Sequence, residues 1–458
     1  MARKKSTYRS AIYKKSSAAW HVTRDFVAQY AWWEIYLLFI GFISFTAVAV
    51  ILILPLGSGP ALTRESGPMP AAGSPQFIST LSDTLGIPVE KAPAIELFNN
   101  GDAFLKPVLA DIDAAQRSIN FMDYVWTDGT FSDVILAHLE QKLRVGVQVR
   151  VMLDAYGGIS APSEKFARFK ALGGKVSVFH SLAPLPWTMA RDHKRNHRRA
   201  IVIDGTTGYT GGVGIDDNWL GNARNDREFR DVMFRVKGSM AGYLQGAFAE
   251  LWASTTGELL VGDRFYPTPV PNTEPSLTYL PLASAPSPDL FKMETFMLLS
   301  MLGAQHEIDI VTPYFLPDDS IRRMLINKAK AGVIVRLLVP DEHNDEASVR
   351  YASHYSYEDL LRSGVRIYEF QRTFNHSKLL IVDGVWSVIG SANMDNRSRK
   401  LNDEIVFGIA DANFAHTLEA TFASDLGRAQ EIKLGSWEKR GIWQRLREVV
   451  AQALVQQY

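Results

Sequence analysis

The chain has 458 residues, of which 47% are hydrophobic, and its 49 basic residues balance 49 acidic ones. A chain of this length and composition can bury two sizeable hydrophobic cores. Its zero net charge gives no global reason to expect a nucleic-acid partner. Because the sequence holds no cysteine, disulfides and thiolate metal sites are excluded.

The N-terminal part of the chain predicts a membrane anchor. Residues 35–54 form a run of 20 residues without a charge, which is long enough to cross the hydrocarbon core of a bilayer. We therefore expect a basic segment over residues 1–30 and a transmembrane helix over residues 31–54. A cleaved signal peptide is the alternative, but its apolar core would be shorter and its leader would not extend over about thirty residues.

The charges on the two sides of this run predict its orientation. Seven basic residues precede it, namely Arg3, Lys4, Lys5, Arg9, Lys14, Lys15 and Arg24. After it, the first charged residue is Arg64. Since cytoplasmic flanks carry the excess of Lys and Arg, we expect the N-terminus in the cytoplasm and the larger part of the chain on the outer side of the membrane.

Proline, glycine and serine mark two linkers. Residues 55–93 begin with a stretch of this composition and are predicted to be a flexible tether. A second proline-rich stretch, residues 267–288, joins the two larger segments. The connector is assigned to residues 257–288, and the proline-rich stretch could also border a substrate entrance. Between and after these linkers lie two larger segments, residues 94–256 and 289–434.

The C-terminal residues 435–458 predict an amphipathic helix. Apolar side chains at helical spacing form one face of it, namely Ile442, Trp443, Leu446, Val449, Val450, Ala453 and Leu454. A stripe of this kind favours packing against the core. A helix that lies on anionic lipid is the alternative.

Two segments of the chain carry nearly the same polar pattern, in which a histidine and a long cation precede a short apolar strand and an Asp-Gly turn. The residues that define them are His197, Arg199, Asp204, His376, Lys378 and Asp383. Residues i and i+2 of a strand point to the same face, so each histidine projects together with its cation. In a phosphodiester-cleaving site, the histidine would attack phosphorus or protonate the leaving oxygen, and the cation would hold the non-bridging oxygens.

The repeat extends beyond these two motifs. Residues 119–126 resemble residues 308–315, and residues 146–154 resemble residues 332–341, in the same order along the chain. Internal duplication is the natural interpretation. Runs rich in Val and Ile alternate with helical stretches, which is typical of α/β structure. We therefore predict an α/β fold of two pseudosymmetric halves that form one active site.

These motifs resemble those of the phospholipase D superfamily and, within it, those of the bacterial cardiolipin synthases, over roughly residues 94–458. The most specific signals lie in the second half, in family order: Thr312, Pro313, Tyr314, Phe315, Asp318, His376, Lys378, Asp383, Gly390, Ser391, Asn393, Arg397, Ser398, Asn402 and Glu404. The resemblance implies that the two histidines face each other across the interface of the halves. One would become a covalent phosphatidyl-histidine, and the other would act as acid and then as base.

The resemblance also assigns supporting roles. Asp231 and Glu404 resemble the carboxylates that orient the histidines, and Ser391 and Asn393 are counted as supporting residues. The two aspartates of the motifs, which we group with the catalytic residues, lie at turns, and this position favours a role in stabilising the turn.

The first half departs from the family pattern at two positions. Arg199 stands where the family usually has lysine, and Gly214 stands where it usually has asparagine. Arginine keeps the charge and can bind phosphate in a bidentate manner, but it is bulkier than lysine. Loss of the asparagine removes one donor to the phosphoryl group, which can cost on the order of a hundredfold in rate.

The family resemblance implies a phosphatidyltransferase that condenses two phosphatidylglycerol molecules to cardiolipin and glycerol. The uncharged run near the N-terminus predicts that this enzyme is anchored in the cell inner membrane by a single span, whereas family members often have two. No metal, nucleotide or redox cofactor is expected. His193 and His197 are four residues apart, but Asp192 is the one acidic residue nearby, so we predict no metal site. By analogy with the family, His197 is expected to be the nucleophile and His376 the acid, and the reverse assignment stays open.

Other functions remain compatible with the sequence. A phospholipase D hydrolase would use the same residues with water as the acceptor. A membrane-tethered nuclease would require a basic groove across the halves, and an inactive lipid-binding scaffold would have a blocked or unpaired His197. The oligomeric state is left open.

Overall fold

The computed structural model describes residues 32–53, 62, 66–180, 182, 193–268, 276–286 and 291–454. The chain divides into two compact units, residues 1–58 and 59–458. The described part of the first unit is helix α2 (Trp32–Ile53). The predicted basic segment over residues 1–30 lies outside the described residues, as do residues 31 and 54 at the ends of the predicted transmembrane helix.

Within the described ranges, no helix combines the length and the hydropathy that crossing a membrane requires. The predicted transmembrane helix therefore stays a prediction.

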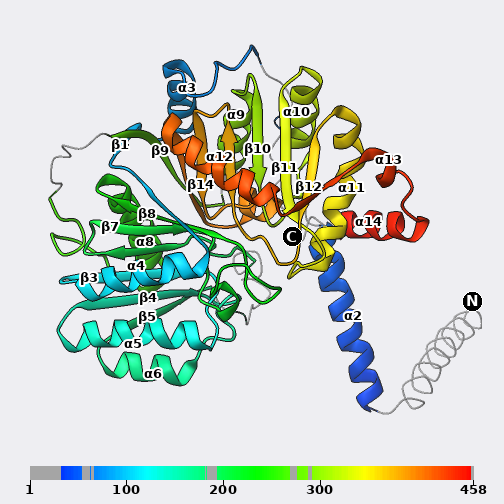
Figure 1. The fold of residues 1–458 in the computed structure, drawn as a ribbon. Coiled ribbons are helices and arrows are strands. Elements are labelled where there is room, and N and C mark those ends of the chain that lie inside the picture. The colour runs from blue at the N-terminus through cyan, green and yellow to red at the C-terminus, as the bar shows by residue number, and fades with distance from the viewer. Residues whose placement is uncertain are drawn as a thin grey trace, which may run out of the picture. The chain divides into compact units, whose positions relative to one another are not determined.

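The first half of the second unit is built on a seven-stranded sheet. Its strands, in spatial order, are β2 (Glu96–Asn99), β8 (Val232–Lys237), β7 (Thr207–Gly211), β6 (Ala200–Ile203), β3 (Ser118–Asp123), β4 (Gln148–Asp154) and β5 (Lys175–Phe179). The three strands β3, β4 and β5 are parallel, and the other pairs are antiparallel. One face packs against α4 (Asn100–Ala114), α5 (Thr130–Arg144) and α6 (Ser163–Ala171), and the other against α8 (Ser239–Thr256) (Figure 1).

The second half is built on a nine-stranded sheet. Its order is β1 (Glu90–Ala92), β9 (Leu277–Ser284), β15 (Glu404–Ala410), β14 (Trp386–Gly390), β13 (Leu379–Val382), β10 (Glu307–Val311), β11 (Ile334–Pro340), β12 (Arg366–Phe370) and β16 (Ala429–Ile432). The central order β15-β14-β13-β10-β11-β12 repeats the order β8-β7-β6-β3-β4-β5 of the first half. The predicted α/β duplication is therefore confirmed by the topology.

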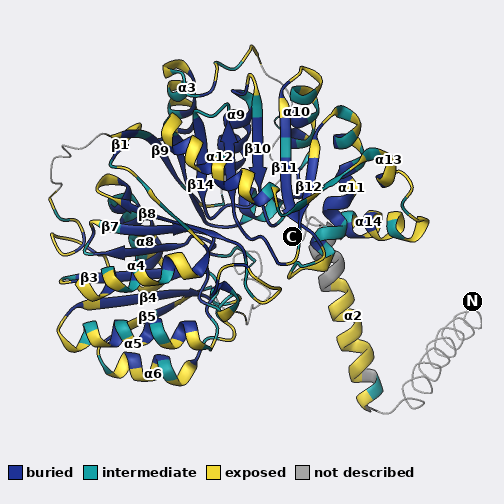
Figure 2. Ribbon diagram, in the orientation of Figure 1, coloured by how far each residue is buried: buried dark blue, intermediate teal, exposed yellow. Residues whose placement is uncertain are grey.

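Helices cover both faces of this second sheet. Helices α3 (Pro75–Leu85), α9 (Lys292–Leu302), α10 (Asp319–Lys330) and α11 (Ala347–Ser363) share a core with one face. Helix α12 (Ala412–Leu426) packs on the other, and α13 (Leu434–Trp437) and α14 (Ile442–Leu454) end the described chain. Side chains of α8 and α12 belong to one central core with strands of both sheets, and Figure 2 shows these strands buried. This shared core fixes the two halves against each other.

Two segments that were predicted to be linkers contribute to the second sheet. The range 55–93 contains α3 and β1, and the range 257–288 contains β9. Helix α3 begins after Ser74, whose hydroxyl accepts a hydrogen bond from the backbone N–H of Phe77. Its buried residues Phe77, Leu81 and Leu85 recur every fourth position, which turns one face toward the core. A flexible tether can therefore occupy only the part of residues 55–93 that precedes α3.

Candidate active site

The segments that precede the two histidines are held by the opposite half of the molecule. The backbone N–H of His197 donates to the carbonyl of Asp403 at 2.9 Å, and that of His376 donates to the carbonyl of Arg230 at 2.7 Å. Asp403 and Arg230 each immediately precede a carboxylate of the site in sequence, Glu404 and Asp231. Backbone pairing therefore places each histidine beside the carboxylate of the other half.

The side chains complete this crosswise arrangement. Nδ1 of His197 lies 2.9 Å from Oε1 of Glu404, and Nδ1 of His376 lies 2.7 Å from Oδ2 of Asp231. All four side chains are buried, and the histidines keep only 4–5% of their surface exposed. When Nδ1 carries the proton that faces a carboxylate, Nε2 is left for the substrate. The sequence predicted both carboxylates, and the structure shows which histidine each one contacts.

The charge states of these pairs follow from burial and mutual attraction. Burial lowers the pKa of His197, against the opposing effect of Glu404. Burial and the nearby Lys378 ammonium lower the pKa of His376 to about 3. Burial alone would raise the pKa of Asp231 and Glu404, but contact with the histidines brings both below the ordinary range. The lowered pKa values of both histidines favour neutral imidazole in the free protein, and neutral imidazole is the nucleophilic form.

The two cations of the motifs differ in their surroundings. Nζ of Lys378 lies 2.6 Å from the carbonyl oxygen of His376 and 3.0 Å from Nε2 of the same residue. Burial lowers the pKa of Lys378 to about 7. In the first half, Nε of Arg199 lies 3.4 Å from Oδ1 of Asp123, whose pKa is raised to about 7 by burial despite this cation.

Arg199 retains an unused donor. Its Nε faces Asp123, but its Nη1 atom is buried and, among the described residues, has no hydrogen-bond partner. Buried guanidinium donors that lack a partner suit the oxygens of a phosphate group. This geometry fits the predicted role of Arg199 in binding the substrate phosphate.

Each carboxylate is held by a further donor, and the two halves use different ones. In the second half, the hydroxyl of Ser391 donates to Glu404, and Ser398 also hydrogen-bonds that carboxylate. In the first half, Nε1 of Trp219 donates to Oδ2 of Asp231 at 2.8 Å. The indole also packs edge-on against the His376 ring, with centroids 5.2 Å apart.

Trp219 explains the glycine at position 214. A Cβ atom built on Gly214 would lie 3.1 Å from Cβ of Val125 and 3.3 Å from the Trp219 ring. A side chain there would press on both Val125 and the indole, which would each have to shift to make room. In the second half, the corresponding Asn393 is buried, and its Oδ1 has no partner among the described residues. Sequence reasoning missed Trp219, although it follows Gly214 by five residues, as Ser398 follows Asn393.

The aspartates of the two motifs lie at the opposite ends of their strands from the histidines. Asp204 accepts hydrogen bonds from the backbone N–H groups of residues 116–118, and Asp383 accepts them from those of residues 305–307. A separation of seven residues along a strand corresponds to about 20 Å. We therefore correct their grouping with the catalytic residues, because both carboxylates hold the start of a neighbouring strand.

Within the described ranges, no group of three or more His, Asp and Glu side chains is arranged to hold a metal ion. His193 contacts Arg397, and burial together with this cation lowers the pKa of His193 to about 4. Asp192 lies outside the described residues.

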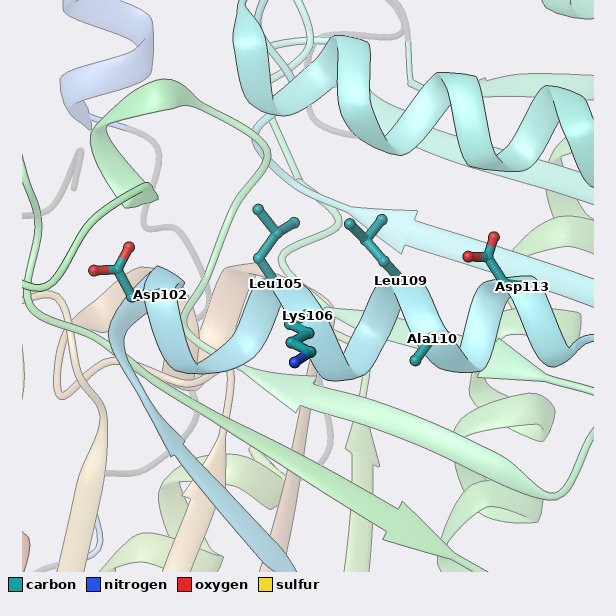
Figure 3. A pocket seen from close by; sticks show the side chains of 6 residues that line it. All are labelled: Asp102, Leu105, Lys106, Leu109, Ala110 and Asp113. Atoms are coloured by element: carbon teal, nitrogen blue, oxygen red, sulfur yellow. The ribbon is translucent and has the colours of Figure 1, made fainter.

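A shallow surface pocket lies along α4, apart from the histidines (Figure 3). It is lined by Asp102, Leu105, Lys106, Leu109, Ala110 and Asp113. None of these residues belongs to the two motifs, so the pocket adds nothing to the site.

Known proteins share both the sequence and the fold of this chain. The family described as "Cardiolipin synthase, PLD-like domain" matches residues 108–252 and 298–426. The probable cardiolipin synthase YwiE of Bacillus subtilis is 31% identical over 360 residues, which are 78% of this chain and 71% of that protein. Cardiolipin synthase 1 of Staphylococcus epidermidis is 33% identical over 362 residues, 79% of this chain and 73% of that protein.

The crystal structure of phosphatidylserine synthase from Haemophilus influenzae has a TM-score of 0.63 at 13% identity and covers 83% of this chain and 97% of that chain. The shared fold and the duplicated domain make this protein an enzyme of the phospholipase D superfamily. Within that superfamily, the chain belongs to the cardiolipin synthase family with PLD-like domains.

Proposed function

We propose that this enzyme transfers a phosphatidyl group from one phosphatidylglycerol molecule to another, which yields cardiolipin and glycerol. The observation that carries the proposal is the pair of crosswise histidine–carboxylate contacts with Lys378 and Arg199 buried beside them. Two relatives that are 31% and 33% identical are named as cardiolipin synthases, which supports this choice of reaction within the superfamily.

In the first step, Nε2 of His197 attacks the phosphorus of the first lipid. The bond from phosphorus to the glycerol headgroup oxygen breaks, and glycerol leaves with a proton from His376. His197 is taken as the nucleophile by analogy with the family, because Nζ of Lys378 lies at nearly equal distances from both ring nitrogens of His376, 3.1 Å from Nδ1 and 3.0 Å from Nε2, and so does not by itself decide between the histidines.

His376 must carry a proton before it can act as the acid. Its pKa is low in the free protein because it is buried next to Lys378. A bound phosphodiester brings a negative charge that offsets Lys378 and Arg199, and this charge raises the pKa of the imidazole. Substrate binding therefore favours the protonated form of His376, which can then act as the acid. The two histidines titrate as a coupled pair.

In the second step, the free hydroxyl of a second phosphatidylglycerol attacks the phosphorus of the phosphatidyl-histidine. Its proton passes to His376, which is now neutral, and the bond from phosphorus to His197 breaks. One phosphodiester is exchanged for another, so the reaction needs no redox or nucleotide cofactor. Asp231 and Glu404 stabilise the imidazolium forms that arise during these steps.

The substrate of this reaction lies in a membrane, and we propose that the N-terminal segment anchors the enzyme there. Helix α2 exposes large apolar side chains along its described length, including Trp33, Tyr36, Leu37, Phe39 and Phe42. The charge distribution around residues 35–54 supports an inner-membrane location with the catalytic part on the outer side.

The product of purified enzyme and labelled phosphatidylglycerol tests the reaction. Cardiolipin together with free glycerol is the expected outcome. Phosphatidic acid would instead identify a hydrolase with water as the acceptor. Cleavage of nucleic acid with no change in the lipid would overturn the assignment to lipid metabolism. The His197→Asn variant is the control for contaminating activity.

A further inference from the structure

Helix α14 (Ile442–Leu454) turns apolar side chains toward solvent. The exposed fractions are 78% for Ile442, 74% for Trp443, 50% for Leu446, 53% for Val449 and 54% for Val450. The positions i, i+1, i+4, i+7 and i+8 fall on one helical face. Figure 2 shows exposed residues along this helix. The predicted packing of this stripe against the core is therefore wrong.

The opposite face of α14 is firmly attached. Glu448 is buried, and both of its carboxylate oxygens lie 3.0 Å from Nε of Arg440. The same arginine contacts Glu358 of α11 at 2.8 Å. Ala451 packs in a small cluster with Val349 and Ala352 of α11. The apolar face is therefore held outward by polar contacts on the inner side.

The charged groups around the exposed face are mainly basic. Arg445 and Arg447 lie on α14, and Lys439 precedes it. Arg445 donates to a backbone carbonyl and lies near enough to Glu358 to help lower the pKa of that carboxyl, and Arg447 stacks over Tyr351 at 5.9 Å. The one acidic residue of the helix, Glu448, is already paired with Arg440. An apolar face flanked by two exposed arginines complements an anionic lipid surface.

We propose that α14 lies in the surface of a bilayer that contains anionic phospholipid, with the five apolar side chains among the acyl chains and the arginines at the headgroups. This inference deepens the proposed function, on which the choice of phosphatidylglycerol as the anionic lipid rests. A second copy of the chain is a poorer occupant, because five side chains are few beside the roughly 20–30 residues on each side of a stable protein interface.

The absence of cysteine allows a direct test with the full chain, because a single introduced cysteine can be labelled. We would place an environment-sensitive fluorophore on Leu446→Cys and, as the matched control, on Val145→Cys, which is an equally apolar but remote site that is 71% exposed. Both proteins are reconstituted into bilayer discs of phosphatidylcholine with or without phosphatidylglycerol, and lipid-borne quenchers report on depth.

A blue-shifted emission and lipid quenching at position 446, stronger with phosphatidylglycerol and absent at position 145, are expected. Equal and weak quenching at both positions would overturn the inference. Disulfide cross-linking of Leu446→Cys into dimers, without lipid quenching, would also overturn it and would identify a second copy as the occupant. These readouts do not depend on turnover, so they stand even if the proposed reaction fails.

A second variant connects the surface to activity. Trp443→Ser combined with Leu446→Ser should cause a severalfold loss of turnover on bilayer substrate and no loss on lipid dispersed in detergent micelles. An equal loss on both substrates would indicate a folding defect and would contradict a surface role. Ile334→Ser, on an exposed apolar residue of β11, is the matched control and should change neither rate.

Discussion

His376 and Asp231 are 145 positions apart in the sequence and belong to different halves, yet Nδ1 of the imidazole lies 2.7 Å from the carboxylate. The reciprocal contact joins His197 to Glu404. Each histidine therefore depends on a carboxylate that its own half does not supply.

The first prediction concerns the two histidines. His197→Asn and His376→Asn should each lower turnover by at least about 1,000-fold, because nucleophile and acid act in the same reaction. The product assay with labelled phosphatidylglycerol measures this. Unchanged melting temperatures would show that the fold is intact, and normal turnover in either variant would refute the two-histidine mechanism.

Trp219→Phe should lower activity mainly at acidic pH. The indole N–H stabilises ionised Asp231, whose pKa it lowers. Without this donor, the pKa of Asp231 rises, so the carboxylate is neutralised at a higher pH and the acid limb of the pH–rate profile moves upward. Phe229→Leu is the control, since it alters the packing on Trp219 but keeps the donor. If the acid limb of Trp219→Phe does not shift, the indole N–H does not control the ionisation of Asp231, and Trp219 acts through packing alone.

Substitutions at Arg199 test the binding of phosphate. Arg199→Lys should keep or raise activity, because the charge remains. Arg199→Ala should lower kcat/KM by about 100-fold or more, since it removes the donors and leaves Asp123 buried without its cation. The steady-state kinetics of both variants provide the measurement. If alanine is harmless, Arg199 does not contact the phosphate.

Lys378 predicts a basic limit to activity. Its pKa is lowered to about 7 by burial, so the side chain becomes neutral as the pH rises through that value and can no longer neutralise phosphate charge. In the free enzyme, kcat/KM should therefore fall above about pH 7. Lys378→Arg should move this limb to higher pH, because guanidinium stays protonated. A basic limb that is identical in both proteins would assign it to another group.

Topology is predicted from the charges that flank residues 35–54. Alkaline phosphatase, which is active only outside the cytoplasm, should be active when fused after Tyr458. A cytoplasmic reporter at the same place should be inactive. The opposite pair of results would show that the enzyme faces the cytoplasm and that the basic N-terminal residues do not set the orientation.

The local motifs made the duplicated fold and most of the site predictable. His197 and His376, their cations and the strands behind them follow from short-range patterns in the sequence. The crosswise pairing did not follow, because contacts between positions such as 197 and 404 leave no local signal. The same limit hid β1 and β9. Strand β1 pairs with β9, and β9 pairs with β15, so these contacts join distant segments to the second sheet.

Helix α3 could have been found. Ser74 before Pro75, followed by Phe77, Leu81 and Leu85, is a capping signal with an apolar stripe. The proline and glycine content of the preceding residues instead led to the interpretation of the whole range 55–93 as a flexible tether. The turn position of Asp204 and Asp383 indicated a structural role. These residues were grouped with the catalytic residues only because they are part of the repeated motif.

Because the histidine–carboxylate pairing is crosswise, residues encoded by one repeat act on the histidine encoded by the other repeat. Trp219, whose ring lies beside Gly214, belongs to the first repeat, but the imidazole that it contacts is the one encoded by the second. Conversely, Ser391 and Ser398 of the second repeat hydrogen-bond Glu404, the carboxylate that contacts the histidine encoded by the first repeat. A substitution in one repeat therefore acts on the chemistry of its twin, and neither repeat can diverge without changing the other's histidine.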